Sequence, residues 1–169
     1  ATLEGVGSYT DVIKGEMHAL TGAGLIGRFT SYSILLPDPL ALLYRGHIVR
    51  DGAKITMKQF AIDLDEGEFD IPTILIIGTS MSAGKTVTGR RVCEILSKAG
   101  LNIVGAKLTG AGRYRDVLSL ADAGAKHIVD FVDAGLPSTV CEESTYREAF
   151  GLMISKVAAH NADVLVAES

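Results

Sequence analysis

Two hydrophobic patterns divide the chain. Up to residue 70, short runs of Val, Ile, Leu and Tyr are broken by Pro and Gly, as in "YSILLPDPLALLYRGHIVRDGAKITMKQFAID". Such runs are typical of strands and turns. The stretch "HIVRDGAKITM" predicts a hairpin, because an Asp-Gly pair tolerates the positive φ angles of a tight turn. We therefore predict a small strand-rich domain over residues 1–70 and a second domain over residues 71–169.

The second part alternates continuous apolar runs with helical patterns. The expected strands are "TILIIG", "LNIVGAKL" and "ADVLVAE", each covered on both faces. The expected helices are "KTVTGRRVCEILSKAG", residues 115–135 with an interruption at Gly124, and residues 144–161 capped by Ser144, with "STV" as a further short strand. This alternation predicts an α/β fold, in which a parallel sheet carries helices on both faces.

Composition narrows the range of partners. The 169 residues are 47% hydrophobic and 21% charged with a net charge of -4, which gives no support for nucleic acid or a membrane surface as a partner. Neither an apolar run long enough to span a bilayer nor a signal pattern occurs. Cys93 and Cys141 lie in apolar patterns without metal-ligand spacing, and we expect buried thiols in a reducing compartment. These features predict a cytoplasmic protein.

The ends of the sequence suggest a longer parent chain. The sequence begins with Ala, and it stops at Ser169 directly after an expected buried strand. An α/β domain rarely stops at such a point, so we expect the second domain to continue beyond this residue.

A loop of small residues joins the first strand of the second part to its helix. Residues 78–86 read "GTSMSAGKT". Backbone N–H groups of such a loop can converge on a polyphosphate, a following helix N-terminus adds a favourable dipole, and the lysine and threonine are placed for phosphate and Mg²⁺. We therefore predict ATP and Mg²⁺ as cofactors. The residues predicted to hold the nucleotide are Gly78, Thr79, Ser80, Met81, Ser82, Ala83, Gly84, Lys85, Thr86 and Val87.

The spacing of this loop carries a resemblance to a known family. Five residues separate Gly78 from Gly84, and the loop resembles the "GT-x-x-x-x-GKT" loop of dethiobiotin synthetase and its relatives. In that family the second strand ends in a lysine followed by Thr/Ser-Gly, and this chain has "GAKLTGAG" with Lys107. The last strand there ends in an acidic residue that helps hold Mg²⁺, which corresponds to Glu168. The resemblance implies a P-loop NTPase fold in which Lys107 faces the substrate and the transferred phosphoryl group.

Further motifs extend the resemblance. Together with "KLTG", the stretch "VDFVDAGLPST" is similar to a related P-loop family that includes kinases of N-acylated amino acids, in which a smaller N-terminal domain precedes the P-loop domain. Partition-type ATPases carry a second lysine where Ser80 and Met81 stand here. Its absence favours an enzyme that acts on a small molecule.

Residues after the second strand are candidates for substrate and metal. Arg113 and Arg115 suit a carboxylate or phosphate, because the guanidinium group offers paired donors. The predicted substrate residues are Thr109, Gly110, Arg113 and Arg115, and the predicted metal ligands, following the resemblance for Asp116, are Thr86, Asp116 and Glu168. Asp130 and Asp133 lie three apart and are predicted to be surface residues of a helix end.

Together these features predict an ATP-dependent enzyme, kinase-like or ligase-like, that transfers a phosphoryl group to a small carboxylate-type metabolite. Lys85 and Lys107 would be its catalytic residues, since such chemistry consists mostly of positioning and charge neutralisation. The alternative is a nucleotide-dependent switch or metallochaperone NTPase that acts on a protein partner, although no Asn-Lys-x-Asp or Cys-x-Cys motif occurs. The sequence leaves a homo-oligomer open.

Overall fold

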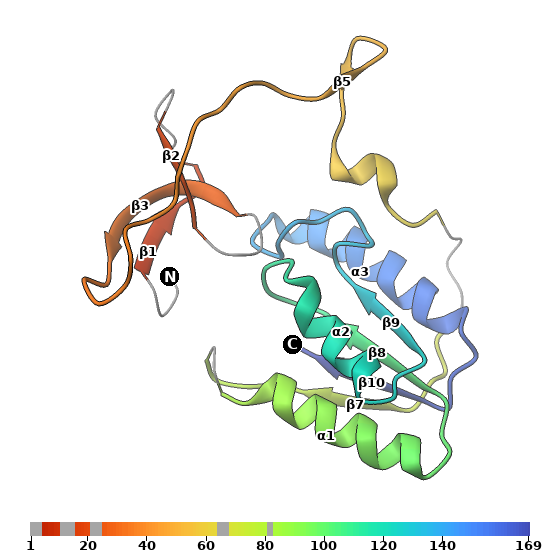
Figure 1. Ribbon diagram of the computed structural model, residues 1–169. Helices are drawn as coiled ribbons and strands as arrows, with labels where there is room; N and C mark the ends of the chain where they lie inside the picture. The colour runs from red at the N-terminus through yellow and green to blue at the C-terminus, as the bar shows by residue number, and fades with distance from the viewer. Residues whose placement is uncertain (1–4, 11–15, 21–24, 64–67, 81–82) are drawn as a thin grey trace. The chain divides into compact units, whose positions relative to one another are not determined.

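The chain is a mixed α/β protein with two compact units, Ala1–Ile55 and Thr56–Ser169 (Figure 1). The computed structural model describes residues 5–10, 16–20, 25–63, 68–80 and 83–169. The sequence places the boundary after residue 70. In the structure, the segment that follows Thr56 already belongs to the second unit, and its Ile62 N–H donates to the Asp133 carbonyl at 2.9 Å.

The first unit consists of antiparallel strands. Its four-stranded sheet has the order β1-β3-β2-β4, formed by β1 (Gly5–Ser8), β3 (Ile26–Tyr32), β2 (Met17–Ala19) and β4 (Ala41–Leu42). The predicted hairpin is confirmed: β5 (Val49–Arg50) pairs antiparallel with β6 (Ala53–Lys54). The turn residues Asp51 and Gly52 have φ angles of 51° and 78°, as a tight turn of this kind requires.

The second unit contains the predicted parallel sheet. Its order is β7-β10-β8-β9, formed by β7 (Thr73–Ile76), β10 (Val164–Glu168), β8 (Ile103–Lys107) and β9 (His127–Asp130), and every pair is parallel. The helical elements are the 3-10 helix η1 (Met57–Phe60), α1 (Lys85–Lys98), α2 (Tyr114–Asp122) and α3 (Glu143–Ala158). None of the described helices is long and apolar enough to cross a membrane.

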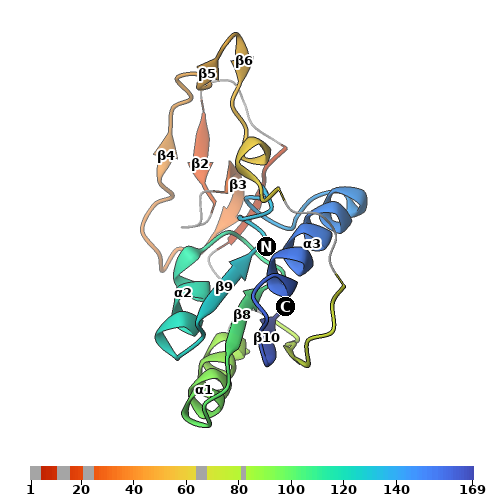
Figure 2. The ribbon, with the colours of Figure 1, turned by 90° about the vertical axis from the view of Figure 1, so that its right-hand side faces the viewer.

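Helix α3 covers one face of the parallel sheet, and α1 and α2 cover the other (Figures 1 and 2). Alternate side chains of the strands build a core layer on each face. The layer on the α3 side contains Val104, Ala106, Val129, Phe131, Ala149, Met153, Val157, Leu165 and Ala167. The layer on the other side, beneath α1 and α2, contains Cys93, Ile103, Leu120, Val164 and Val166. By the same alternation, the last residues of β8 and β10 point toward the α1 and α2 side. This places Lys107 and Glu168 on one face.

Three predicted elements differ in the structure. Residues 127–130 form strand β9 and not helix, because Gly124 with φ of 107° ends the α2 turn and the apolar run "HIV" then pairs with β8. The "STV" segment forms no strand, and only an isolated bridge joins Ser138 to Ala111. Helix α3 has Glu142 at its N-cap, so Ser144 lies inside the helix.

Strand β7 is less covered than predicted. It lies at the edge of the sheet, and its side chains are largely exposed, with Leu75 at 54% and Ile77 just beyond it at 73%. The expectation that both faces of this strand are buried is therefore wrong for the described residues, because β7 has only β10 beside it.

The two cysteines should differ in reactivity. Cys93 is fully buried, and burial raises the pKa of its thiol to about 11. At pH 8 only about one Cys93 thiol in a thousand would be ionised. Cys141 is exposed, which corrects the expectation of two buried thiols. We expect a thiol-reactive chromophore at pH 8 to label one cysteine quickly in the folded protein and both after unfolding. Equal labelling rates in the folded protein would contradict this.

Candidate functional site

Three adjacent strands end in buried charged residues. In the parallel register, Lys107 of β8 lies opposite Glu168 of β10 on one side and Asp130 of β9 on the other. Their exposed fractions are only 7%, 8% and 3%. Strand alternation turns all three toward the α1 and α2 side. Because buried charges are costly without partners, the neighbours of these groups decide what the site can do.

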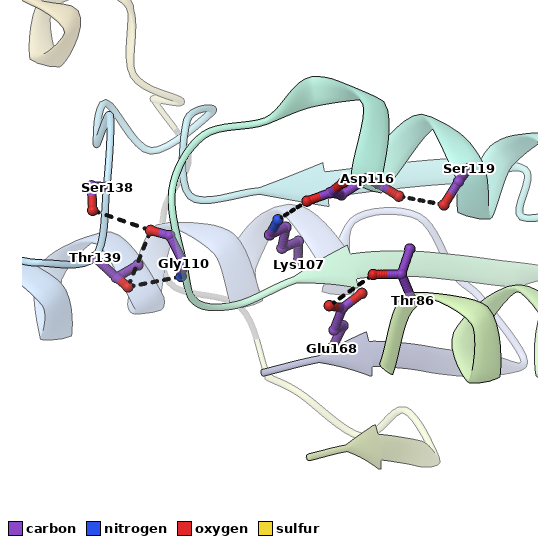
Figure 3. Close-up of polar contacts among 8 residues, drawn as sticks. All are labelled: Thr86, Lys107, Gly110, Asp116, Ser119, Ser138, Thr139 and Glu168. Atoms are coloured by element: carbon purple, nitrogen blue, oxygen red, sulfur yellow. Dashed lines mark hydrogen bonds and ion pairs between the residues drawn. The ribbon is translucent and has the colours of Figure 1, made fainter. Parts of the chain in front are cut away.

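Lys107 forms an ion pair with Asp116, which lies in the first turn of α2 (Figure 3). The loop after β8 packs directly on this lysine. Gly110 has φ of 123°, and a Cβ at this position would lie 3.4 Å from Cε of Lys107. Ser138 and Thr139 hold Gly110 in place, since the Ser138 hydroxyl donates to its carbonyl at 3.2 Å and its N–H donates to Oγ1 of Thr139 at 2.9 Å. The backbone of Gly110, held by these two bonds, therefore lies next to the end of the Lys107 side chain.

Glu168 is held from α1. The Thr86 hydroxyl donates a hydrogen bond to Oε1 of Glu168 at 3.1 Å, so the first turn of α1 is tied to the carboxyl end of β10 (Figure 3). The predicted metal ligands Thr86 and Glu168 are therefore adjacent, whereas the third, Asp116, is engaged by Lys107.

The glycine-rich loop ends in a left-handed residue. Gly84 is the N-cap of α1 with φ of 86°, a conformation that glycine adopts without strain. The ammonium of Lys85 turns back over the loop and donates to the Ser80 carbonyl at 3.1 Å. Its stem packs against Gly78, where an added Cβ would lie 2.9 Å from Cγ of the lysine.

The remaining residues predicted to hold the nucleotide lie in the loop or at the start of α1. Thr79 and Ala83 belong to the described part of the loop, whereas Met81 and Ser82 lie outside the described residues. Val87 is on α1 with 70% of its surface exposed.

The predicted substrate residues are not all brought together. The Thr109 hydroxyl lies 3.3 Å from that of Ser169, and Gly110 packs on Lys107. Arg113 precedes α2 and Arg115 lies within it, and both are exposed. Neither arginine forms an ion pair with another described residue.

Asp130 is the residue of this site that sequence reasoning misses. It is buried at the end of β9 and does not lie on the surface of a helix, as the sequence suggested. Its Oδ1 accepts the Val132 N–H, but its Oδ2 has no hydrogen-bond partner within the described part of the chain. Burial is the largest influence on this carboxyl and raises its pKa. The negative charges of Asp133 and Asp116 also raise the pKa, whereas the Val132 N–H and the Lys107 charge lower it. The available signal was a charged residue that ends an apolar run, as Lys107 and Glu168 also do.

The chain matches none of the protein-family models, curated proteins or solved structures with which it was compared.

The oxygen atoms of the site could hold a hard cation such as Mg²⁺ only if other ligands completed its coordination shell. Among the residues that the structure describes, no group of three His, Cys, Asp or Glu side chains is arranged to hold a metal ion. Mg²⁺ usually takes one or two carboxylates and completes its shell with phosphates and water. Thr86 and Glu168, whose oxygens are 3.1 Å apart, fit this kind of shared binding.

Proposed function

We propose that the second unit is a P-loop domain that binds Mg-ATP and transfers its terminal phosphoryl group to a small carboxylate-type metabolite. The observation that carries the proposal is the meeting of four groups at the carboxyl edge of the sheet. Lys85 and Thr86 begin α1, Thr86 bonds to Glu168, and Lys107 ends the next strand. In open parallel sheets this edge is where ligands bind.

The phosphates would lie over the glycine-rich loop. The N-terminus of a 14-residue helix, α1, offers free N–H groups and the positive end of its dipole. Lys85 has no carboxylate partner among the described residues, and its ammonium is bonded only to a carbonyl. It can therefore be drawn toward a polyphosphate without the loss of an ion pair.

Thr86 and Glu168 would hold Mg²⁺ on the phosphates, and Asp116 could join them if its ion pair with Lys107 opened. Bound Mg²⁺ supplies charge neutralisation on the phosphate oxygens. The protein's part is to place the Thr86 hydroxyl and the Glu168 carboxylate next to each other, which the bond between them already achieves.

Lys107 would stabilise the charge of the transferred group and of an anionic acceptor. A buried ammonium is worth more for this purpose than an exposed one, because water does not screen it. Arg113 and Arg115, exposed near the start of α2, are free to bind the carboxylate of the acceptor, and Thr109 and Gly110 line the same loop. These roles are parts of the proposal.

Calorimetric titration with Mg-ATP and Mg-GTP tests it. We expect Lys85→Ala to weaken the binding of the preferred nucleotide roughly 10-fold to 150-fold, the size of a lost charge-assisted contact. Lys98→Ala is the matched control, because Lys98 is an exposed lysine at the other end of α1 and should bind as the wild type does. The proposal fails if the wild type binds neither nucleotide, or if both variants bind equally well.

A further inference from the structure

Lys107 forms an ion pair with one carboxylate, although other carboxylates lie beside it. Its ion pair is with Asp116 of α2, while Asp130 stands in register beside it on β9. The residue as a whole is only 3% exposed, and its buried Oδ2 has no hydrogen-bond partner among the described residues. A buried carboxylate oxygen without a donor is unusual enough to require an explanation.

We propose that Asp130 is a positioning residue for Lys107. It is a second ion-pair partner, to which the ammonium group moves when Asp116 turns away.

The register makes this move short. Paired residues on neighbouring parallel strands have backbones roughly 4.8 Å apart, and Lys107 and Asp130 point to the same face. The lysine stem has four methylene groups, so rotation about its side-chain bonds can carry the ammonium from α2 toward β9. Gly110 lies next to the end of this stem and adds no side chain there, since a Cβ at this position would lie 3.4 Å from Cε of Lys107.

Burial makes a second partner necessary. With 7% exposure, Lys107 cannot replace a lost partner with bulk water, and an unpaired buried charge is strongly destabilising. Glu168, on the other neighbouring strand, already accepts the Thr86 hydroxyl.

The two carboxylate oxygens of Asp130 differ in their contacts. Its Oδ1 accepts the Val132 N–H of the turn that follows β9, and this leaves Oδ2 for the lysine. The raised pKa of this carboxyl, caused first by burial, agrees with a charge that is incompletely compensated as long as Lys107 faces Asp116.

The exchange has a consequence that does rest on the proposed function. Asp116 can contribute to the metal shell only after it leaves Lys107. Asp130 would keep the ammonium group paired and in place during that change. Lys107 would then remain beside the transferred group, whichever carboxylate pairs with it.

The crystal structure of Asp116→Ala tests the inference without any nucleotide, so its outcome is separate from that of the calorimetric experiment. We expect Nζ of Lys107 within roughly 3.2 Å of Oδ2 of Asp130. An ammonium that instead pairs with Glu168, or that turns into solvent, would overturn the inference. A role of Asp130 limited to the turn would leave the distance to Lys107 long.

A double-mutant cycle on urea unfolding provides a second test that does not depend on crystals. Asp116→Ala and Asp130→Asn remove one partner each. If the two effects were independent, the folding equilibrium constant would fall in the double variant by the product of the two single factors. We expect it to fall about tenfold further than that. The asparagine keeps the oxygen that accepts the Val132 N–H. A control cycle uses Asp122→Asn, at the exposed end of α2, in place of Asp116→Ala. In that cycle the factors by which the two single variants lower the folding equilibrium constant should simply multiply. Multiplicative losses in the Asp116 and Asp130 cycle would count against the exchange.

Discussion

Replacement of Phe131 by alanine should lower the free energy of unfolding by about 3–5 kcal/mol. Phe131 is fully buried directly after β9, in the core layer that also holds Met153 and Val157 of α3. The truncation removes apolar contacts and leaves a cavity between the helix and the sheet. Native domains are stable by only about 5–15 kcal/mol, so the variant would lose a large share of its stability.

Urea denaturation monitored by circular dichroism measures this loss. Phe60→Ala is the matched control, because Phe60 also belongs to the second unit but is 67% exposed, and its removal should change the stability by no more than about 0.5 kcal/mol. Similar losses for the two variants would mean that α3 does not pack on the sheet through Phe131.

The second large effect concerns turnover. Lys107→Met should slow the proposed phosphoryl transfer about 100-fold to 1,000-fold, the range typical for removal of one group that stabilises transition-state charge. Nucleotide binding should stay within about threefold of the wild type, because the proposed phosphate-binding residues lie in the loop before α1 and not on β8. Methionine nearly preserves the volume of the buried stem, so the change removes mainly the charge and its bond to Asp116.

Release of ADP from Mg-ATP, measured in the presence of carboxylate acceptors that the wild type uses, gives the rate. Lys126→Met is the control, since Lys126 is an exposed lysine outside the site and its loss should leave the rate unchanged. A Lys107→Met protein with the wild-type rate would remove this lysine from the chemistry and leave only a nucleotide-binding site.

The sequence predicted those features that depend on local physics. The Asp51-Gly52 hairpin, the end of α1 before Gly100 and the strands that end in Lys107 and Glu168 all follow from turn residues and apolar runs. Strand β9 was missed because "HIVDFVDAG" contains too few residues to separate a strand period from a helix period.

The site was predicted only as far as its motifs extend. Lys85, Thr86 and Lys107 were predicted as site residues because they follow glycine-rich or apolar segments in recognisable order. Asp130 was not, since its importance depends on the register between β8 and β9, which brings it beside a lysine 23 positions earlier in the chain. Likewise, the engagement of Asp116 by Lys107 depends on how α2 packs, and no local pattern encodes that contact.

The strand order has a consequence for when the site can form during folding. Strands β7 and β8 do not pair with each other, and β10, which comes after both of them and after β9 in the sequence, lies between them. The contacts that close the sheet therefore span long stretches of chain, which is the kind of topology that folds slowly. Glu168 reaches Thr86 only when β10 inserts between its two neighbours. A nascent chain would thus carry the glycine-rich loop and α1 for some time before Glu168 joins them, and the proposed nucleotide binding would report the insertion of β10.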